Sequence, residues 1–465
     1  MEGTYFTPSV MDRIIELSFH LLENTGISLN DTDALAELAN MGYKINDSRV
    51  LVEKKKAKTY LESHIKAKQP KTKSGPISIS CWVNNYSHSY IPPYEYGEER
   101  FTTKTLIQSS GAIQALGSLY GKKLGICGYA SDVPVVMQDV NRYWLESKYF
   151  GGHNPEPMDS RTYPYLMEMA SINGCKTLYV PIYMISPLKM GDEGYKIVRA
   201  YGNKINVVSV SSMPSFGIST PFAISEAFAI TLAEVLGGAI IVEDLTNIPA
   251  HIYVNVESFD FRYMTQAFGT PEKMMLETLT RDFQRALYGS WDDVIQVEIH
   301  TQATCPGLQS AAEKSLTMMN GYHLAKNANK DCCFRGAGTL AMDEVFSPTQ
   351  LVMDLEIQKG ISHMENWYGF DKDAVDMNEL LEGINESFIA TERTSELARR
   401  YYNDSKVFHR YSLTGWKNAG KPDSLRHAED IAQKAWENDP IKVIDHETEK
   451  AIDEVYQSAL RYFTS

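Results

Sequence analysis

Polar side chains follow most of the short apolar runs in the middle of this chain. If these runs are parallel β-strands, their carboxyl ends meet at one end of a barrel or one edge of a sheet, where α/β proteins place their chemistry. The candidate side chains are Tyr129, Asp132, His153, Tyr183, Ser186, Ser211, Ser212, Glu243, Glu257, His300, Gln302 and Arg335. Together they could bind and orient a small polar substrate. For any single residue, a solvated loop position or a satisfied hydrogen bond at the rim is the alternative.

Eight apolar runs are the strands that would position this set. They span residues 124–128, 147–151, 177–181, 205–210, 239–242, 252–256, 294–299 and 332–336, and helical stretches separate or follow most of them, for example 271–288, 308–326 and 349–368. Alternating strands and helices predict the α/β class and, with eight strands, a (β/α)8 TIM barrel. An open doubly wound sheet is the alternative, but no G-x-G-x-x-G follows a strand, so a dinucleotide-binding fold gains no support.

Residues 205–244 illustrate the repeating unit. The first strand is apolar on both faces, as in a buried parallel strand. Thr220 and Pro221 suit a helix start, and Gly237 and Gly238 suit its end, before a second strand that stops at Glu243. The helix between them is apolar almost all round, whereas an outer helix that faces water should be amphipathic. We therefore expect another subunit to cover it, which makes this helix a candidate contact in a homo-oligomer.

The barrel accounts for only part of the chain. Residues 1–103 predict an N-terminal helical and small-β extension, in which the Tyr-rich segment 77–101 forms short strands or a hairpin beside the barrel. Residues 104–370 predict the barrel, and residues 371–465 predict C-terminal helices, two of them clearly amphipathic.

Composition restricts the class of partner and compartment. The formal net charge of −14 argues against a nucleic-acid partner and favours a cytoplasmic protein. No uninterrupted apolar run approaches the roughly 18 residues of a membrane span, and the N-terminus does not resemble a signal peptide. Six cysteines in 465 residues predict thiols rather than a disulfide scaffold. The 27 Tyr, 17 Phe and 6 Trp could fill a core or line a pocket for an organic cation.

Several motifs, in this order and spacing, resemble the trimethylamine methyltransferase superfamily. Ser186-Pro187-Leu188 resembles its "SPL", the loop 217–221 resembles "G-x-(S/T)-x-P", and 233–238 resembles "AEVL-(A/G)-G". Residues 259–262 and 269–272 are similar to "D-(M/F)-R" and "G-(S/T)-P-E", and 347–356 is similar to "S-x-x-(K/Q)-L-x-x-D-x-E". The segment 392–394 departs from the family, since many relatives have His-Thr there. The chain contains only standard residues, as in the non-pyrrolysine branch.

The resemblance implies methyl transfer to the cobalt(I) of a separate corrinoid (cobalamin) protein. Relatives without pyrrolysine act on quaternary amines such as glycine betaine, proline betaine and carnitine. A quaternary nitrogen already carries its positive charge, so a tertiary amine can leave without a general acid. The protein need only hold the cation, fix the other end of the substrate and aim one methyl group. No tightly bound cofactor and no metal are expected in this chain.

Specific residues are then candidates for binding such a substrate. Aromatic candidates for the cation are Tyr94, Tyr96, Phe222, Phe346, Trp367 and Tyr368, with core packing as the alternative. Trp367 lies four residues after His363, so both share a helical face. Arg335 is the natural partner of a substrate carboxylate, unless it pairs with Glu243 or Asp244. The other candidates, His300 and Gln302, lie at the end of the preceding strand, where His300 could donate to the carboxylate.

Two other functions compete with this one. Some barrel methyltransferases bind zinc through thiolates and activate a thiol acceptor. Here Cys332-Cys333 lie on the last predicted strand, and His300 and Cys305 follow the previous one. Adjacent strand residues point to opposite faces, however, which opposes a shared ion. The second alternative is a quaternary-amine-binding homologue without catalysis.

Overall fold

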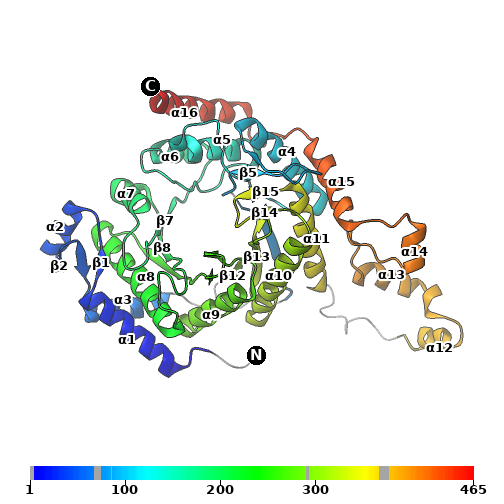
Figure 1. Ribbon diagram of the computed structural model, residues 1–465, viewed down its shortest axis with the longest axis horizontal. Helices are drawn as coiled ribbons and strands as arrows, with labels where there is room; N and C mark the ends of the chain where they lie inside the picture. Colours follow the sequence, from blue (N-terminus) through cyan, green and yellow to red (C-terminus); the bar gives the residue numbers. More distant parts are fainter. Residues whose placement is uncertain (1–4, 68–74, 85, 290–292, 366–375) are drawn as a thin grey trace.

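A computed structural model describes residues 5–67, 75–84, 86–289, 293–365 and 376–465. Its centre consists of two parallel sheets of three strands each. One sheet has the order β7 (Tyr179–Tyr183), β8 (Val207–Ser212), β9 (Ala250–Val254), and the other has the order β12 (Val294–Glu298), β13 (Asp331–Ala337), β4 (Ile79–Val83). Figure 1 shows these strands inside a ring of helices. The chain is therefore an α/β protein, while a closed eight-stranded barrel stays a prediction.

Eight helices lie around these strands and form the ring, with one or more of them after each strand. They are α4 (Thr103–Tyr120), α5 (Gln138–Phe150), α6 (Tyr163–Ile172), α7 (Asp192–Tyr201), α8 (Ile224–Thr246), α9 (Pro271–Tyr288), α10 (Leu308–Ala328) and α11 (Pro348–Met364). Their sequence signals are local: Thr270 caps α9 by accepting a hydrogen bond from the Lys273 amide at 3.3 Å, Pro271 occupies the first turn, and Gly289 ends the helix in the left-handed region.

The remaining elements decorate the ends of the ring. The N-terminal part contains α1 (Pro8–Asn24), β1 (Ile27–Ser28), α2 (Thr32–Asn40), β2 (Lys44–Asn46), β3 (Arg49–Leu51) and α3 (Lys54–Ala67). Short strands follow: β5 (Ser89–Tyr90), β6 (Glu99–Arg100), β10 (Phe259–Asp260), β11 (Thr265–Gln266), β14 (Thr339–Leu340) and β15 (Val345–Phe346). The C-terminal helices are α12 (Met377–Asn385), α13 (Glu392–Tyr401), α14 (Leu413–Asn418), α15 (Ser424–Trp436) and α16 (His446–Thr464). α15 packs on α11 and α4, and α16 packs on α5 and α6.

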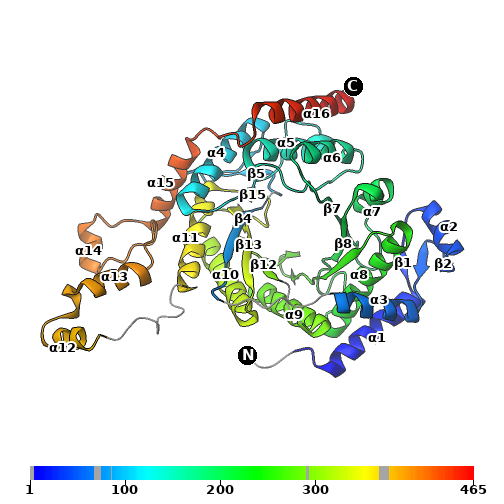
Figure 2. The same ribbon diagram turned by 180° about the vertical axis from the view of Figure 1, so that it is seen from behind.

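Five predicted strands are confirmed within two residues, as β7, β8, β9, β12 and β13. Two were wrong: residues 147–151 belong mainly to α5, which ends at the left-handed Gly151, and residues 239–242 lie inside α8. A third prediction was also wrong, because residues 124–128 form no strand. Conversely, β4 was expected beside the barrel, yet it pairs with β13 in parallel (Figure 2). The predicted division at residue 103 would cut β4 from its own sheet.

The error in α8 has a packing cause. Gly237 and Gly238 do not end this helix, which continues to a left-handed Asn247. A Cβ atom on Gly237 would lie 2.5 Å from Leu22 Cδ2 and 2.6 Å from Ile27 Cγ1, and one on Gly238 would lie 2.8 Å from Met184 Sδ. The glycines therefore allow α8 to approach its neighbours on two sides. The predicted cap at Thr220 was also wrong, because the helix begins at Ile224.

The apolar surface of α8 is covered within the chain. α1 lies along α8, and the Ser18 hydroxyl donates to the Ala229 carbonyl at 2.9 Å. Our expectation that another subunit covers this helix was therefore wrong, and the oligomeric state stays untested. Among the described residues, α8 alone is long and apolar enough to cross a membrane, but most of it is buried inside the protein.

Candidate functional site

Each parallel strand has one face toward the helices and one toward the inside of the ring. Outward side chains are apolar, as with Val208 and Val210 of β8, whereas Ser209 and Ser211 of the same strand point inward. Our expectation that this strand is apolar on both faces was wrong. We call the inward positions the inner face; they are Ser80, Trp82, Tyr179, Tyr183, Ser209, Ser211, His251, Tyr253, Gln296, Glu298, Cys333 and Arg335.

Arg335 is the principal cation of the inner face. Its Nη1 donates to Gln296 Oε1 at 3.1 Å, and its Nε lies 3.7 Å from Glu298 Oε1. The neighbouring Glu298 carboxylate raises the pKa of Arg335 despite the opposing effect of burial. The side chain remains 41% exposed. A guanidinium with several N–H groups accessible from inside the ring can still bind a carboxylate in two-point geometry.

Tyrosine rings lie around this guanidinium. Tyr183 is 49% exposed to water, yet the surrounding protein raises its pKa to about 12. Tyr86, which follows β4, is similarly accessible, and burial also raises its pKa. Water therefore reaches part of both side chains, although protein surrounds the rest. Arg335 interacts electrostatically with Tyr86 and Tyr183, so these groups lie in one neighbourhood.

A histidine follows β12 and lies close to Glu298, the carboxylate that neighbours Arg335. His300 Nδ1 is 2.5 Å from Asp343 Oδ2, and its Nε2 is 3.8 Å from Glu298 Oε2. Burial alone would lower the pKa of His300, but the Asp343 carboxylate raises it. Asp343 also accepts hydrogen bonds from Asn84 and Thr339, both at 2.6 Å. Arg335, Glu298, His300 and Asp343 thus form a continuous chain of alternating basic and acidic side chains.

A second buried cation lies behind this chain. Lys273 is ion-paired with Glu257, and its Nζ is 3.7 Å from Glu277 Oε1. Burial raises the pKa of Glu277. The ring of Phe268 lies next to both Lys273 and His300, with its centroid 4.6 Å from that of His300. Glu257 is therefore occupied by a structural partner.

Most of the predicted aromatic candidates lie away from the inner face. The Tyr94 hydroxyl donates to Asp430, its ring contacts Arg426 of α15, and Tyr96 is largely exposed. Phe346 is fully buried in β15, and Phe222 lies on an exposed loop after β8. These four residues are distributed over three different neighbourhoods. Trp367 and Tyr368 lie outside the described residues.

Three polar candidates are also placed by the structure. His363 lies in the last turn of α11, near the amino end of β4, because Glu365 accepts a hydrogen bond from the Ile77 amide at 3.1 Å. The amide of Gln302 donates to Glu313 at 2.9 Å, beyond the end of β12. Glu243 accepts from the Tyr60 hydroxyl and the Ala250 amide, both at 2.7 Å. The expectation that Glu243 follows a strand was wrong: it lies at the amino end of β9.

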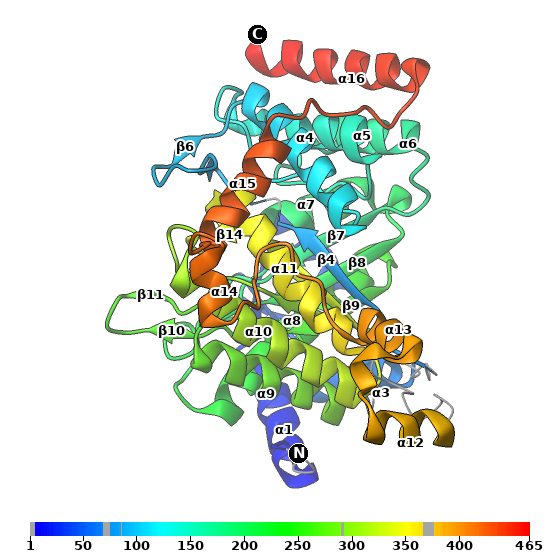
Figure 3. The same cartoon turned by 90° about the vertical axis from the view of Figure 1, so that its right-hand side faces the viewer.

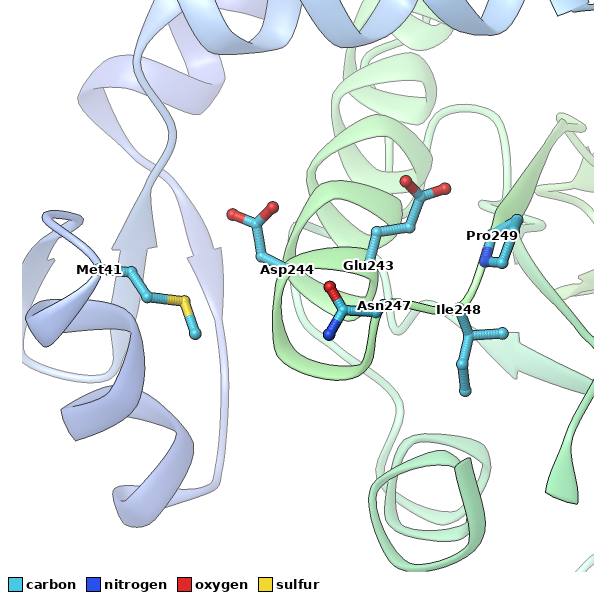
Figure 4. Close-up of a pocket in the computed structure, with 6 residues that line it drawn as sticks. All are labelled: Met41, Glu243, Asp244, Asn247, Ile248 and Pro249. Atoms are coloured by element: carbon cyan, nitrogen blue, oxygen red, sulfur yellow. The ribbon is translucent and has the colours of Figure 1, made fainter. Parts of the chain in front are cut away.

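A hollow beside Glu243 is separate from the inner face. Figure 4 shows it between α2 and the turn that joins α8 to β9, with Met41, Glu243, Asp244, Asn247, Ile248 and Pro249 around a space of about 500 Å³. Its carboxylates already have partners, since Asp244 accepts from Tyr43 and Lys56. These bonds connect the N-terminal extension to α8. The two carboxylates of the hollow are therefore engaged in structural contacts.

The cysteine pair on β13 divides between two environments. Cys332 faces the helices and is almost fully buried, whereas Cys333 faces inward. Their thiols therefore cannot bind one zinc ion together. No three His, Cys, Asp or Glu side chains come together as ligands within the described part of the chain.

Comparison with known proteins identifies a sequence family that this chain matches. Residues 168–459 match the sequence profile of the trimethylamine methyltransferase family (MTTB), and this span is more than half of the chain. The chain belongs to the trimethylamine methyltransferase family. Its membership of the branch without pyrrolysine stays a prediction.

Individual relatives are distant. Trimethylamine methyltransferase MttB1 of Methanosarcina acetivorans is 24% identical over 325 residues, which are 69% of this chain and 60% of the relative. Two crystal structures of MtmB, one a hydroxylamine complex and one the Methanosarcina barkeri monomethylamine methyltransferase, are 12% identical. Each superposition covers 92% of this chain and 86% of the MtmB chain, with TM-scores of 0.44 and 0.43.

Some motifs shared with the family have internal partners here. Asp354, in the motif 347–356, is fully buried and forms an ion pair with Lys314 at 2.7 Å, and it also accepts from the Gly338 amide at 2.8 Å. The Ser186 hydroxyl of "SPL" donates to Glu234 of α8 at 2.8 Å, and Ser212 donates to the same carboxylate. Burial raises the pKa of Glu234. These motif residues hold loops against helices.

The sequence prediction missed several inner-face residues: Trp82, Tyr179, Tyr253, Gln296 and Glu298. A signal was available, because the segments YVPIY (179–183) and AHIYV (250–254) alternate with period two. Most of the predicted polar candidates follow strands, whereas the inward positions within a strand also face the inside of the ring.

Proposed function

We propose that this protein is a (β/α)8-barrel methyltransferase that removes a methyl group from a small quaternary amine with a carboxylate. The acceptor is the cobalt(I) of a corrinoid carried by a separate protein. We also propose that it acts in the cytoplasm. The chain spans 60% of the length of the curated relative MttB1.

The observation that carries the proposal is the position of Arg335 among accessible tyrosines on the inner face. An exposed guanidinium suits a carboxylate, and aromatic rings suit a quaternary ammonium, which gains roughly 0.5–2 kcal/mol per ring. Glycine betaine, proline betaine and carnitine carry both groups. Trp82, Tyr86, Tyr183 and Tyr253 replace Tyr94, Tyr96, Phe222 and Phe346 as aromatic candidates in this proposal.

The residues of this chain act by binding and orientation. Arg335 holds the carboxylate, and Glu298 and Gln296 hold the guanidinium in place. The rings and the Glu298 carboxylate stabilise the ammonium. The partner's cobalt(I) supplies the electron pair for the new bond to the methyl carbon. The electrons of the broken C–N bond remain on nitrogen, so the tertiary amine leaves neutral and no general acid is needed.

The direct test is methyl transfer to free reduced cobalamin. Wild-type protein is incubated with cob(I)alamin and a panel of glycine betaine, proline betaine, carnitine, choline and trimethylamine, and methylcobalamin is followed by absorbance. We expect turnover of at least one carboxylated quaternary amine. Turnover of trimethylamine alone, or of a thiol acceptor with zinc, would contradict the substrate class. Binding without demethylation would favour the non-catalytic homologue.

Arg335→Gln tests the residue itself. We expect the KM for the carboxylated substrate to rise about 100-fold, because a two-point charged contact is lost. Any residual activity on choline, which has no carboxylate, should stay unchanged in this variant. Arg410→Gln removes a guanidinium far along the chain from the inner face and is the control. An equal loss on both substrates would indicate a structural role for Arg335.

A further inference from the structure

Apolar side chains are exposed where the loop after β8 meets the β10–β11 hairpin. Figure 3 shows this hairpin projecting from the same side of the ring as β6 and β14. The exposed residues, which we call the aromatic rim, are Met213, Ile218, Phe222, Phe261, Tyr263 and Met264. Phe222 is 70% exposed and Tyr263 is 79% exposed. Contiguous exposed aromatic and methionine side chains usually indicate a surface that binds another molecule.

The rim is a built surface. The ring centroids of Phe216 and Phe222 are 4.4 Å apart, and those of Phe222 and Phe261 are 6.1 Å apart. The rings of Phe222 and Phe261 lie against Gly217, where a Cβ atom would be 2.6 Å from Phe222 Cδ2 and 2.8 Å from Phe261 Cζ. The positive φ of 81° at Gly217 also favours glycine. The backbone therefore holds two rings side by side and leaves their outer faces exposed.

The position of the rim connects it to the inner face. Met213 directly follows β8, so the rim begins where this strand ends. The loop and the hairpin are joined by bonds such as Gln266 Nε2 to Ser215 Oγ at 3.2 Å. A molecule bound on the rim would therefore lie over the carboxyl ends of β8 and β9. Any acceptor that reaches a methyl group on the inner face from this side must pass beside the rim.

Charge distinguishes between possible occupants. Arg262, between Phe261 and Tyr263 of the rim, is exposed, and among the described residues its guanidinium has no partner. The neighbouring Asp260 carboxylate instead accepts hydrogen bonds from the Arg262 and Tyr263 amides, at 2.7 and 3.2 Å. If two copies of this chain met through the rim about a two-fold axis, the two Arg262 side chains would approach each other, and their like charges would repel. The rim also has six exposed apolar residues, against 20–30 residues per side in a stable interface. Both features favour a transient partner with an acidic group opposite Arg262.

We propose that the aromatic rim is the docking surface for the separate protein that carries the corrinoid. This inference rests on the proposed function, and it assigns a place on this chain to the partner. It also gives Phe222 a role in partner binding, in place of the substrate contact expected from the sequence.

The test separates docking from chemistry. Two variants are made, Tyr263→Ser/Met264→Ser and Arg262→Glu, together with the control Ile441→Ser/Tyr462→Ser, which alters two exposed side chains of the C-terminal region. Methyl transfer is measured with free cob(I)alamin and with a purified cobalamin-loaded corrinoid protein. We expect both rim variants to keep their rate with free cobalamin. Their KM for the corrinoid protein should rise at least tenfold, while the control stays unchanged.

Other outcomes have distinct meanings. An unchanged KM in both rim variants would overturn the docking inference while leaving the proposed function intact. A wild type that methylates neither acceptor would overturn the proposed function itself. Light scattering after size-exclusion chromatography is measured in parallel. A wild-type dimer that the rim variants dissociate, with unchanged transfer to the corrinoid protein, would assign the rim to a second copy of this chain.

Discussion

His300 and Asp343 show how single residues set the charge of the inner face. Their contact of 2.5 Å lies in a mostly buried position, and each group shifts the pKa of the other toward its charged form. The pKa of His300 is raised and that of Asp343 is lowered. The stability that His300 contributes is full below the ordinary histidine pKa of about 6.5 and is lost as the pH rises through the raised value. The contribution of Asp343 is lost only at acid pH, below its ordinary value of about 3.9.

We therefore expect the effect of His300→Gln to depend on pH. At pH 5.5 the variant should lower the free energy of unfolding by about 3 kcal/mol, because it leaves a buried carboxylate without its charged partner. The difference from wild type should shrink as the pH rises above the raised pKa, since the wild type then loses the same charge. Urea unfolding at pH 5.5 and 9 measures both values. Equal differences at the two pH values would contradict a charged pair.

At the scale of elements, α8 shows how glycine decides packing rather than a helix end. Its two central glycines face different neighbours, with Gly237 against Leu22 and Ile27 and Gly238 against Met184 and Val210. The helix is thus in close contact with α1 on one side and with the strands on the other. Any side chain at Gly237 must push these elements apart.

Gly237→Val should destabilise the protein by about 1–3 kcal/mol through overpacking. Gly97→Ala is the matched control, because nothing lies within 4 Å of a Cβ atom at that position, and its effect should be within about 0.5 kcal/mol. Denaturant midpoints of the two variants and wild type give the comparison. A stable Gly237→Val protein would show that α1 and α8 can separate without loss.

At the scale of the whole molecule, the N-terminal extension acts as the cover of the ring. α1 contributes Met11, Ile14, Phe19 and Leu22 to the same core as α8. Further bonds connect the extension to the ring, including Arg199 Nη2 of α7 to Glu37 Oε1 at 2.7 Å. Without this cover, the apolar surface of α8 would face water.

Ile14→Ala should therefore cost about 2–5 kcal/mol, as expected for a large-to-small change in a core. Ile14 is fully buried, whereas the adjacent Arg13 is exposed, so Arg13→Ala is the control and should be nearly neutral. Thermal unfolding of both variants tests the prediction. Equal midpoints would indicate that α1 is dispensable for the core.

Elements whose signals are local could be predicted from the amino-acid sequence. The bounds of α9 follow from Thr270, Pro271 and Gly289, and β12 and β13 follow from short apolar runs. The motif order also indicated the family, which the profile match confirms. The site was only partly predictable: Arg335 and Tyr183 lie together on the inner face, whereas the predicted aromatic candidates that the structure describes lie elsewhere.

The face that each residue occupies, and the residues opposite it, depend on how distant segments pack together. Gly237 resembled a helix stop because its reason, contact with Leu22 and Ile27, lies more than 200 positions away in the chain. Asp354 belongs to a motif shared with the family, but its partner Lys314 lies on another helix. Caps and turns are encoded within a few neighbouring residues. Close approach, burial and ion pairing depend on segments that folding brings together, so they remained outside the reach of local patterns.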